Sequence, residues 1–163
     1  LLSCRLPGME DRSPIRIVAD GRLRLTPAMK LIKTARQVPT WVVTIPATEA
    51  ERRRALEHRG VTIIEVEGTP SGHPAPEAVG AVLADHGITR VLIEGGAGVA
   101  GSYLNAGLVD RLAWFRAARV IGSDGVPATG PLGINELQDA PSFSRLGVMQ
   151  IGDDVLETFS RQD

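Results

Sequence analysis

Short apolar runs alternate with helical segments along most of the chain. Four of these runs are rich in β-branched residues, four to six residues long and apolar on both faces: 15–19, 41–45, 61–66 and 91–94. Such runs are typical of strands in a sheet that helices cover on both sides. We therefore predict four buried strands separated by helices, with the first part of the sheet parallel.

Helix-start and helix-end signals lie between these runs. Thr48-Glu49-Ala50-Glu51 matches a capping box that would open a helix ending near Gly60. Pro76 suits the first turn of a second helix, which continues through Ala84 and which Gly87 ends. The pattern up to this point is strand, helix, strand, helix, strand.

A third helix is expected from about Val99 to Asn105, with Gly107 closing it and with Val99, Tyr103 and Leu104 on its buried face. The pattern then changes. Residues 112–116 predict a strand, and 122–133 form a Gly- and Pro-rich connection. Residues 146–151 and 155–159 flank Gly-Asp-Asp and predict an antiparallel hairpin. The sequence thus predicts an α/β fold with a mixed sheet, parallel first and antiparallel at the end, and helices on both faces.

Composition fits an ordinary globular protein. The chain has 163 residues, 43% of them hydrophobic, and we predict a single domain over 1–163. A formal net charge of −1 gives no overall field for nucleic acid or anionic lipid. No apolar run approaches membrane length and no signal segment opens the chain, so we expect a cytoplasmic protein. Because the chain begins Leu1-Leu2 without Met, we expect it to lie within a longer polypeptide.

Metal-site chemistry finds little support. The single cysteine, Cys4, excludes a Cys-rich zinc finger and the zinc site of a nucleobase deaminase. Cys4 has no histidine close in sequence, and we assign it no nucleophilic role. The three histidines, His58, His73 and His86, are scattered without metal-ligand spacing. We expect them at the surface and predict no metal site.

The most informative stretch is 91–102, in which an apolar run ends in Glu94 and a glycine-rich turn leads into a helix. This order places backbone N–H groups and the positive end of a helix dipole at one point, which favours a phosphate. Gly96, Gly98 and Gly101 even have the spacing of the dinucleotide fingerprint. A dinucleotide-binding Rossmann fold, however, requires the motif after its first strand and an acid about 20 residues later. Neither holds here, so the simple Rossmann interpretation fails.

Two charged features near this stretch allow alternatives. Arg116 and Arg119 occupy the region where the Rossmann acid would lie, and they suit either a cofactor 2′-phosphate or a solvated strand face. Glu94 at the end of a buried strand would cost free energy without a partner. It either caps N–H groups of its own turn or accepts hydrogen bonds from a hydroxyl-rich ligand.

Two other charged runs have simple structural explanations. Arg52-Arg53-Arg54 has Glu49, Glu51 and Glu57 nearby and is expected to be a solvated helix face with i,i+4 ion pairs. Asp153-Asp154 lies between two apolar strands and is expected to form the hairpin turn.

The sequence resembles the reductase domain of the bifunctional riboflavin-biosynthesis deaminase/reductase. The resemblance runs through the whole chain, and its motifs lie at 2–8, 14–20, 94–101, 106–110 and 121–125. It implies a dihydrofolate-reductase-like fold. It also implies an NADPH-dependent reduction of 5-amino-6-(5-phosphoribosylamino)uracil to the ribitylamino compound, with hydride transfer to the ribose C1′.

The resemblance also implies roles for individual residues. It assigns Leu2, Arg5 and Glu94 to the substrate, with Arg5 suited to clamp the 5′-phosphate because a guanidinium can bind phosphate through two parallel hydrogen bonds. It assigns the cofactor to Gly21 and to the turn and helix start, whose residues are Gly96, Ala97, Gly98, Val99, Ala100, Gly101 and Ser102. It further implies a homodimer formed through the sheet edge and the late antiparallel strands.

The chain departs from the family pattern in two places. Gly21 stands where relatives usually carry Ser or Thr, so one hydroxyl contact to the cofactor is missing. The family's reductase domain begins several dozen residues earlier, with a strand, a helix and an Ala-Asp-Asp-Pro motif that contact substrate and nicotinamide. Two alternatives therefore stay open: a non-catalytic nucleotide-binding or dimerisation module, and a reductase of the undeaminated 2,5-diaminopyrimidine.

Overall fold

The computed structural model describes residues 2–9, 11–46 and 49–162. They form two compact units that divide between Thr89 and Arg90. Each unit is described by itself, and the expectation of a single domain over 1–163 stays a prediction.

The first unit contains a three-stranded parallel sheet. Its strands are β1 (Arg16–Ala19), β2 (Thr40–Thr44) and β3 (Val61–Glu65), in the order β1-β2-β3. Ile17 pairs with Trp41 in the register of β1 and β2. These three predicted strands are confirmed, with ends that differ by no more than a residue from those read off the sequence.

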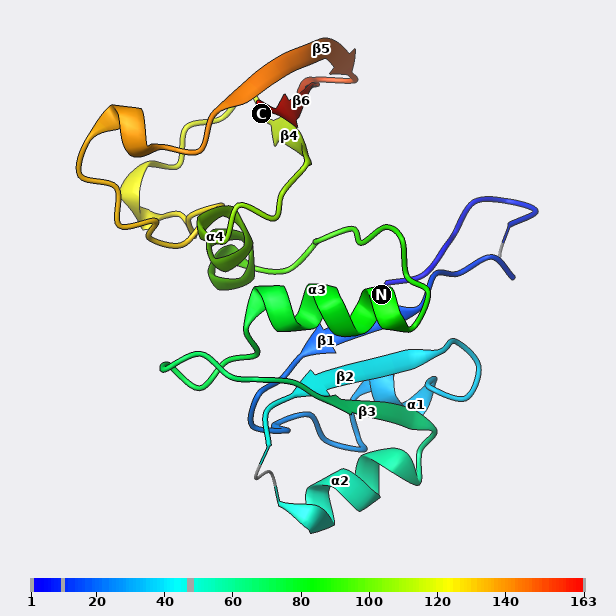
Figure 1. Ribbon diagram of the computed structural model, residues 1–163. Coiled ribbons are helices and arrows are strands. Elements are labelled where there is room, and N and C mark those ends of the chain that lie inside the picture. The colour runs from blue at the N-terminus through cyan, green and yellow to red at the C-terminus, as the bar shows by residue number, and fades with distance from the viewer. Residues whose placement is uncertain (1, 10, 47–48, 163) are drawn as a thin grey trace. The chain divides into compact units, whose positions relative to one another are not determined.

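Helices cover both faces of this sheet (Figure 1). Beside α1 (Lys30–Lys33) and α2 (Ala50–Glu57) lies one core cluster, and beside α3 (Pro76–Asp85) lies the other. The first cluster comprises Leu23, Ile32, Ala35, Val42, Leu56 and Val61. The second comprises Val43, Ile64, Val66, Val79 and Leu83. Alternate residues of β2 therefore enter opposite cores, as a strand with two apolar faces requires.

The predicted ends of these helices are confirmed where the structure describes them. Gly60, after α2, has φ +87°, and Gly87, after α3, has φ +78°. Glycine adopts this left-handed conformation without a Cβ clash and commonly ends helices for that reason. Thr48 of the predicted capping box lies outside the described residues, and Glu49 occupies the N-cap of α2 without a side-chain cap bond.

A buried arginine joins α1 to the sheet. The Arg16 side chain on β1 donates to the hydroxyls of Thr34 (2.8 Å) and Thr40 (2.6 Å) and to the carbonyl of Val38 (2.8 Å). It also donates to the carbonyls of Leu31 and Thr34 at the end of α1. Burial lowers the pKa of Arg16 from its ordinary value because the charged form loses hydration. The sequence did not predict α1, and this set of contacts explains how so short a helix is held.

The second unit contains a helix and an antiparallel sheet. Its elements are α4 (Ala97–Asn105), the 3₁₀ turns η1 (Gly122–Asp124) and η2 (Leu137–Asp139), and the strands β4 (Arg111–Arg116), β5 (Phe143–Ile151) and β6 (Asp154–Arg161). The strand order is β4-β6-β5. The predicted third helix, late strand and hairpin are all confirmed, and so is the mixed α/β fold class.

The hairpin turn has the geometry that its residues favour. Ile151 pairs with Asp154, which leaves Gly152 and Asp153 as a two-residue loop. Gly152 has φ +60°, and Leu23 is the only described residue other than glycine with a positive φ. This combination matches a type II′ turn with glycine in its first central position. The interpretation of Asp153-Asp154 as turn chemistry is confirmed.

The fourth predicted strand is wrong. Residues 91–94 form no strand in the structure, and Val91 and Leu92 are 50% and 80% exposed. A strand needs a hydrogen-bonded neighbour, and no strand in the described part of the chain pairs with this run. The strands consequently form two separate three-stranded sheets instead of one continuous sheet.

The two units differ in how much apolar surface they bury. Every fully buried apolar side chain among the described residues lies in the first unit. Val99, Tyr103 and Leu104, predicted on the buried face of α4, are half-buried. None of the helices in the described ranges has the length and apolar character needed to cross a bilayer.

Candidate functional site

Asp20 organises the loop that follows β1. Its carboxylate is almost fully buried and accepts hydrogen bonds from the backbone N–H of Leu25 (2.8 Å) and from the Arg24 side chain (3.4 Å). Its own N–H donates to the carbonyl of Val43 (2.9 Å), and its carbonyl accepts from Leu23. These bonds hold Leu23 at φ +46°, a conformation that costs free energy for a residue with a Cβ.

Gly21 lies against a second loop. A Cβ at Gly21 would lie 2.6 Å from the carbonyl oxygen of Gly72. Gly72 belongs to the loop after β3, in which Gly68 and Pro74 form an isolated antiparallel bridge. Position 21 therefore accepts only glycine while this loop keeps its place. The cofactor contact expected at Gly21 stays a prediction, and it can come only from the backbone.

The predicted substrate residues of the first unit lie near its start. Leu2 is half-buried and Arg5 is exposed, both in an irregular segment. The nearby N–H of Cys4 donates to the Ser13 hydroxyl (3.1 Å), which fixes this segment against residue 13. The exposed Arg5 guanidinium is accessible to an anion, and its role as a phosphate clamp stays a prediction.

The start of α4 has the features of an anion site. Gly96 is its N-cap, no side chain caps the helix, and space is open beside Gly96 and Gly98, where a Cβ would meet nothing within 4 Å. The first N–H groups of a helix have no partner within it and carry the positive end of its dipole. The residues present therefore fit the phosphates of a dinucleotide cofactor.

Two members of the predicted cofactor set also have structural contacts. Gly101 is buried, and a Cβ there would lie 3.1–3.3 Å from backbone atoms of Gly130. The N–H of Gly130 donates to the carbonyl of Ala97 (2.7 Å), so α4 and this loop pack backbone to backbone. The Ser102 hydroxyl donates to the carbonyl of Val99 (2.9 Å). The cofactor roles of Gly101 and Ser102 stay predictions.

The expectation that Glu94 ends a buried strand is wrong. Glu94 is exposed and lies in an irregular segment two residues before the N-cap of α4. Because the strand does not form, its carboxylate keeps its contact with water and needs no buried partner. Its predicted contact with substrate remains open from this exposed position.

Arg116 is a solvated strand residue, as one of the two interpretations held. Its guanidinium lies 3.1 Å from Glu157 on the neighbouring strand β6, and Arg145 on β5 reaches the same carboxylate at 3.2 Å. A side chain engaged in this cross-strand group is a poor candidate for a cofactor phosphate. Arg119 is exposed in the connection after β4.

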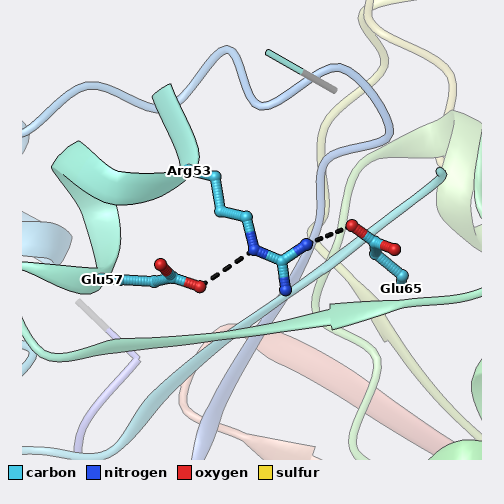
Figure 2. Close-up of polar contacts among 3 residues, drawn as sticks. All are labelled: Arg53, Glu57 and Glu65. Atoms are coloured by element: carbon cyan, nitrogen blue, oxygen red, sulfur yellow. Dashed lines mark hydrogen bonds and ion pairs between the residues drawn. The ribbon is translucent and has the colours of Figure 1, made fainter. Parts of the chain in front are cut away.

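The arginine run of α2 divides by function. Arg53 contacts Glu57 one turn away (3.0 Å) and reaches Glu65 at the end of β3, as Figure 2 shows. The hydrogen bond from Glu57, followed by the charge of Glu65, raises the pKa of Arg53. Arg52 pairs with Glu49 (2.9 Å). The predicted helix-face ion pairs are confirmed, and Arg53 additionally ties α2 to the sheet.

A cavity missed by the sequence analysis lies beside these elements. It measures about 410 Å³ and is lined by residues 23–27, after β1, and by Arg52 and Ala55 of α2. Its walls come from segments far apart in the sequence, so no local motif could have revealed it.

Comparison with known proteins places this geometry in a family. Residues 1–156 match the family model described as the RibD C-terminal domain. The riboflavin biosynthesis protein RibD of Bacillus amyloliquefaciens is 31% identical over 163 residues, which cover 99% of this chain and 43% of that protein. The 5-amino-6-(5-phosphoribosylamino)uracil reductase of Buchnera aphidicola is 25% identical over 152 residues, 91% of this chain and 68% of that protein.

A solved structure supports the fold. Acinetobacter baumannii RibD, form 2, superposes with a TM-score of 0.78 at 20% identity, covering 98% of this chain and 42% of that one. The chain thus spans about two fifths of the length of the RibD proteins that it matches. The resemblance that the sequence motifs indicated is confirmed, and the chain belongs to the RibD C-terminal domain family.

Proposed function

We propose that this chain is the reductase part of a riboflavin-biosynthesis enzyme. It would reduce 5-amino-6-(5-phosphoribosylamino)uracil to the ribitylamino compound in the cytoplasm. The match of residues 1–156 to the family model carries this proposal, and the printed name of the Buchnera relative supports the substrate.

NADPH is the proposed cofactor, and it would supply the hydride that ribose C1′ receives as the sugar opens. The protein's contribution is binding and orientation. The uncapped start of α4, with open space at Gly96 and Gly98, would donate backbone N–H groups to the cofactor phosphates. Gly21 would add a backbone contact.

The substrate would be held by Leu2, Arg5 and Glu94. Arg5 is exposed and suits the 5′-phosphate, because a planar guanidinium matches phosphate geometry. The Glu94 carboxylate would accept hydrogen bonds from hydroxyl or amino groups of the substrate, since an ionised carboxylate is an acceptor only.

We also propose a homodimer formed through the second sheet. Its strands leave large apolar side chains exposed, among them Phe115 (64%), Val148 (60%) and Met149 (61%). β4 and β5 are the outer strands of the order β4-β6-β5, and an outer strand presents unpaired N–H and C=O groups. A second copy of the chain could cover both.

Turnover of the complete-length protein tests the reaction. With NADPH, we expect reduction of the deaminated uracil substrate and lower kcat/KM with NADH or with the 2,5-diaminopyrimidine. Glu94→Gln should lower kcat/KM by about tenfold or more, the loss of one hydrogen bond from a charged acceptor. Glu51→Gln, an equal charge change on an exposed helix residue, serves as the control.

Three results would redirect the proposal. Preference for the diaminopyrimidine would identify the reductase of the undeaminated compound. Saturable NADPH binding without turnover of either pyrimidine would favour the non-catalytic module. Unchanged turnover in Glu94→Gln would remove Glu94 from the reaction.

A further inference from the structure

The cavity beside α2 lies at the edge of the sheet where ligands of α/β proteins bind. Residues 23–27 follow the carboxyl end of β1, and Arg52 lies in the first turn of α2, which follows β2. Open α/β sheets bind ligands in the crevice outside the carboxyl ends of their strands. The cavity is therefore in the right place for a ligand, within the first unit alone.

Two guanidinium groups line this cavity in a similar way. Arg24 contacts Asp20 through Nε at 3.4 Å, and Arg52 contacts Glu49 through Nε at 2.9 Å. A carboxylate at Nε orients a guanidinium and leaves its terminal Nη groups for another acceptor. Among the described residues, neither arginine has a further ion pair, and the side chains are 71% and 51% exposed.

The rest of the lining defines the ligand class. Leu23, Leu25, Pro27 and Ala55 are apolar, and Thr26 is the remaining member of the lining. An apolar wall suits the faces of a sugar or a base, whereas two guanidinium edges suit a phosphate monoester. A volume of about 410 Å³ has room for more than a phosphate group.

We propose that Arg24 and Arg52 bind the phosphate monoester of a phosphorylated ribose in this cavity. Asp20 is a positioning residue, because the same carboxylate fixes the loop through Leu25 and orients Arg24. The ribose is either the 2′-phosphorylated ribose of the cofactor or the 5′-phosphorylated ribose of the substrate. The identity of these two sources rests on the proposed function; the anion site rests on the cavity.

Calorimetric titration of the whole chain tests the site. The two probes are 2′,5′-ADP, which carries the 2′-phosphate of the cofactor, and ribose 5-phosphate, which represents the substrate. We expect one of them to bind. Arg24→Gln and Arg52→Gln should each weaken that binding by about tenfold or more, as expected for the loss of hydrogen bonds to a charged group.

Arg54→Gln is the matched control, since Arg54 lies on the same helix, is exposed and does not line the cavity. It should change binding by less than about twofold, as an exposed charge outside the site does. Circular dichroism of each variant verifies the fold, and Arg52→Lys, which keeps the charge but loses the planar fork, should give intermediate binding.

The site is overturned if the chain binds neither probe at millimolar concentration, or if Arg54→Gln weakens binding as much as the other two variants. Loss of binding in the two cavity variants supports the site even if the complete-length protein reduces neither pyrimidine. Failure of the proposed function and failure of this site are therefore distinguishable.

Discussion

Glycines of one short motif serve different purposes. Gly98 has open space where its Cβ would be, whereas Gly101 lies against the backbone of Gly130. In dinucleotide-binding turns, one glycine lets the ligand approach the backbone and another permits close packing of the helix. The motif of this chain divides in the same way, with a loop of the second unit as the packing partner of Gly101.

Alanine substitutions separate the two purposes. Gly101→Ala should destabilise the protein by about 1–3 kcal/mol, because the new methyl group meets backbone atoms that have little room to move. Gly98→Ala should leave stability unchanged or raise it by up to about 1 kcal/mol, since alanine favours a helix more than glycine does. Urea unfolding of the two variants measures both effects. Equal stabilities would show that Gly130 moves away without cost.

At the scale of elements, buried polar side chains fix the short pieces that apolar periodicity does not define. Arg16 satisfies the carbonyls at the end of α1, and Asp20 holds the loop after β1. Both were visible in the sequence only as part of a family motif. Their roles depend on partners many residues away, such as Thr40 and Val43.

Removing the Arg16 guanidinium should weaken the first unit. Arg16→Met keeps much of the apolar stem but leaves buried carbonyls and two threonine hydroxyls without their donor. We expect a loss of about 2–4 kcal/mol in the free energy of unfolding, from several buried groups left unpaired. Arg36→Met, on an exposed arginine with one carbonyl contact, should cost less than about 1 kcal/mol. Similar losses in both variants would contradict the role of Arg16.

At the scale of the whole molecule, apolar surface is unevenly distributed. The first unit has two buried clusters, while the second exposes apolar side chains on its strands. A soluble protein rarely leaves a large apolar patch uncovered unless a partner covers it. This distribution favours the proposed association of two copies.

Light scattering tests the dimer. The chain should have the mass of two copies. Met149→Glu, which places a charge on the outer strand β5, should reduce the mass to that of one copy. Val120→Glu adds the same charge at a residue that is 99% exposed in a loop, and it should leave the dimer intact. A single-copy mass for the unaltered chain would disprove the association.

The sequence by itself determined the three parallel strands, α2, α3, α4 and the final hairpin, because apolar periodicity, Pro76 and the glycines at helix ends act locally. Its motifs also determined the family, and they located the turn before α4. Only the tertiary structure decided that residues 91–94 form no strand, since a strand depends on a neighbour and not on its own composition. It likewise decided the packing of Gly101 and the pairing of Arg24 with Arg52 around one cavity. These features join residues distant in the chain, and their energies depend on distances that a linear pattern does not contain.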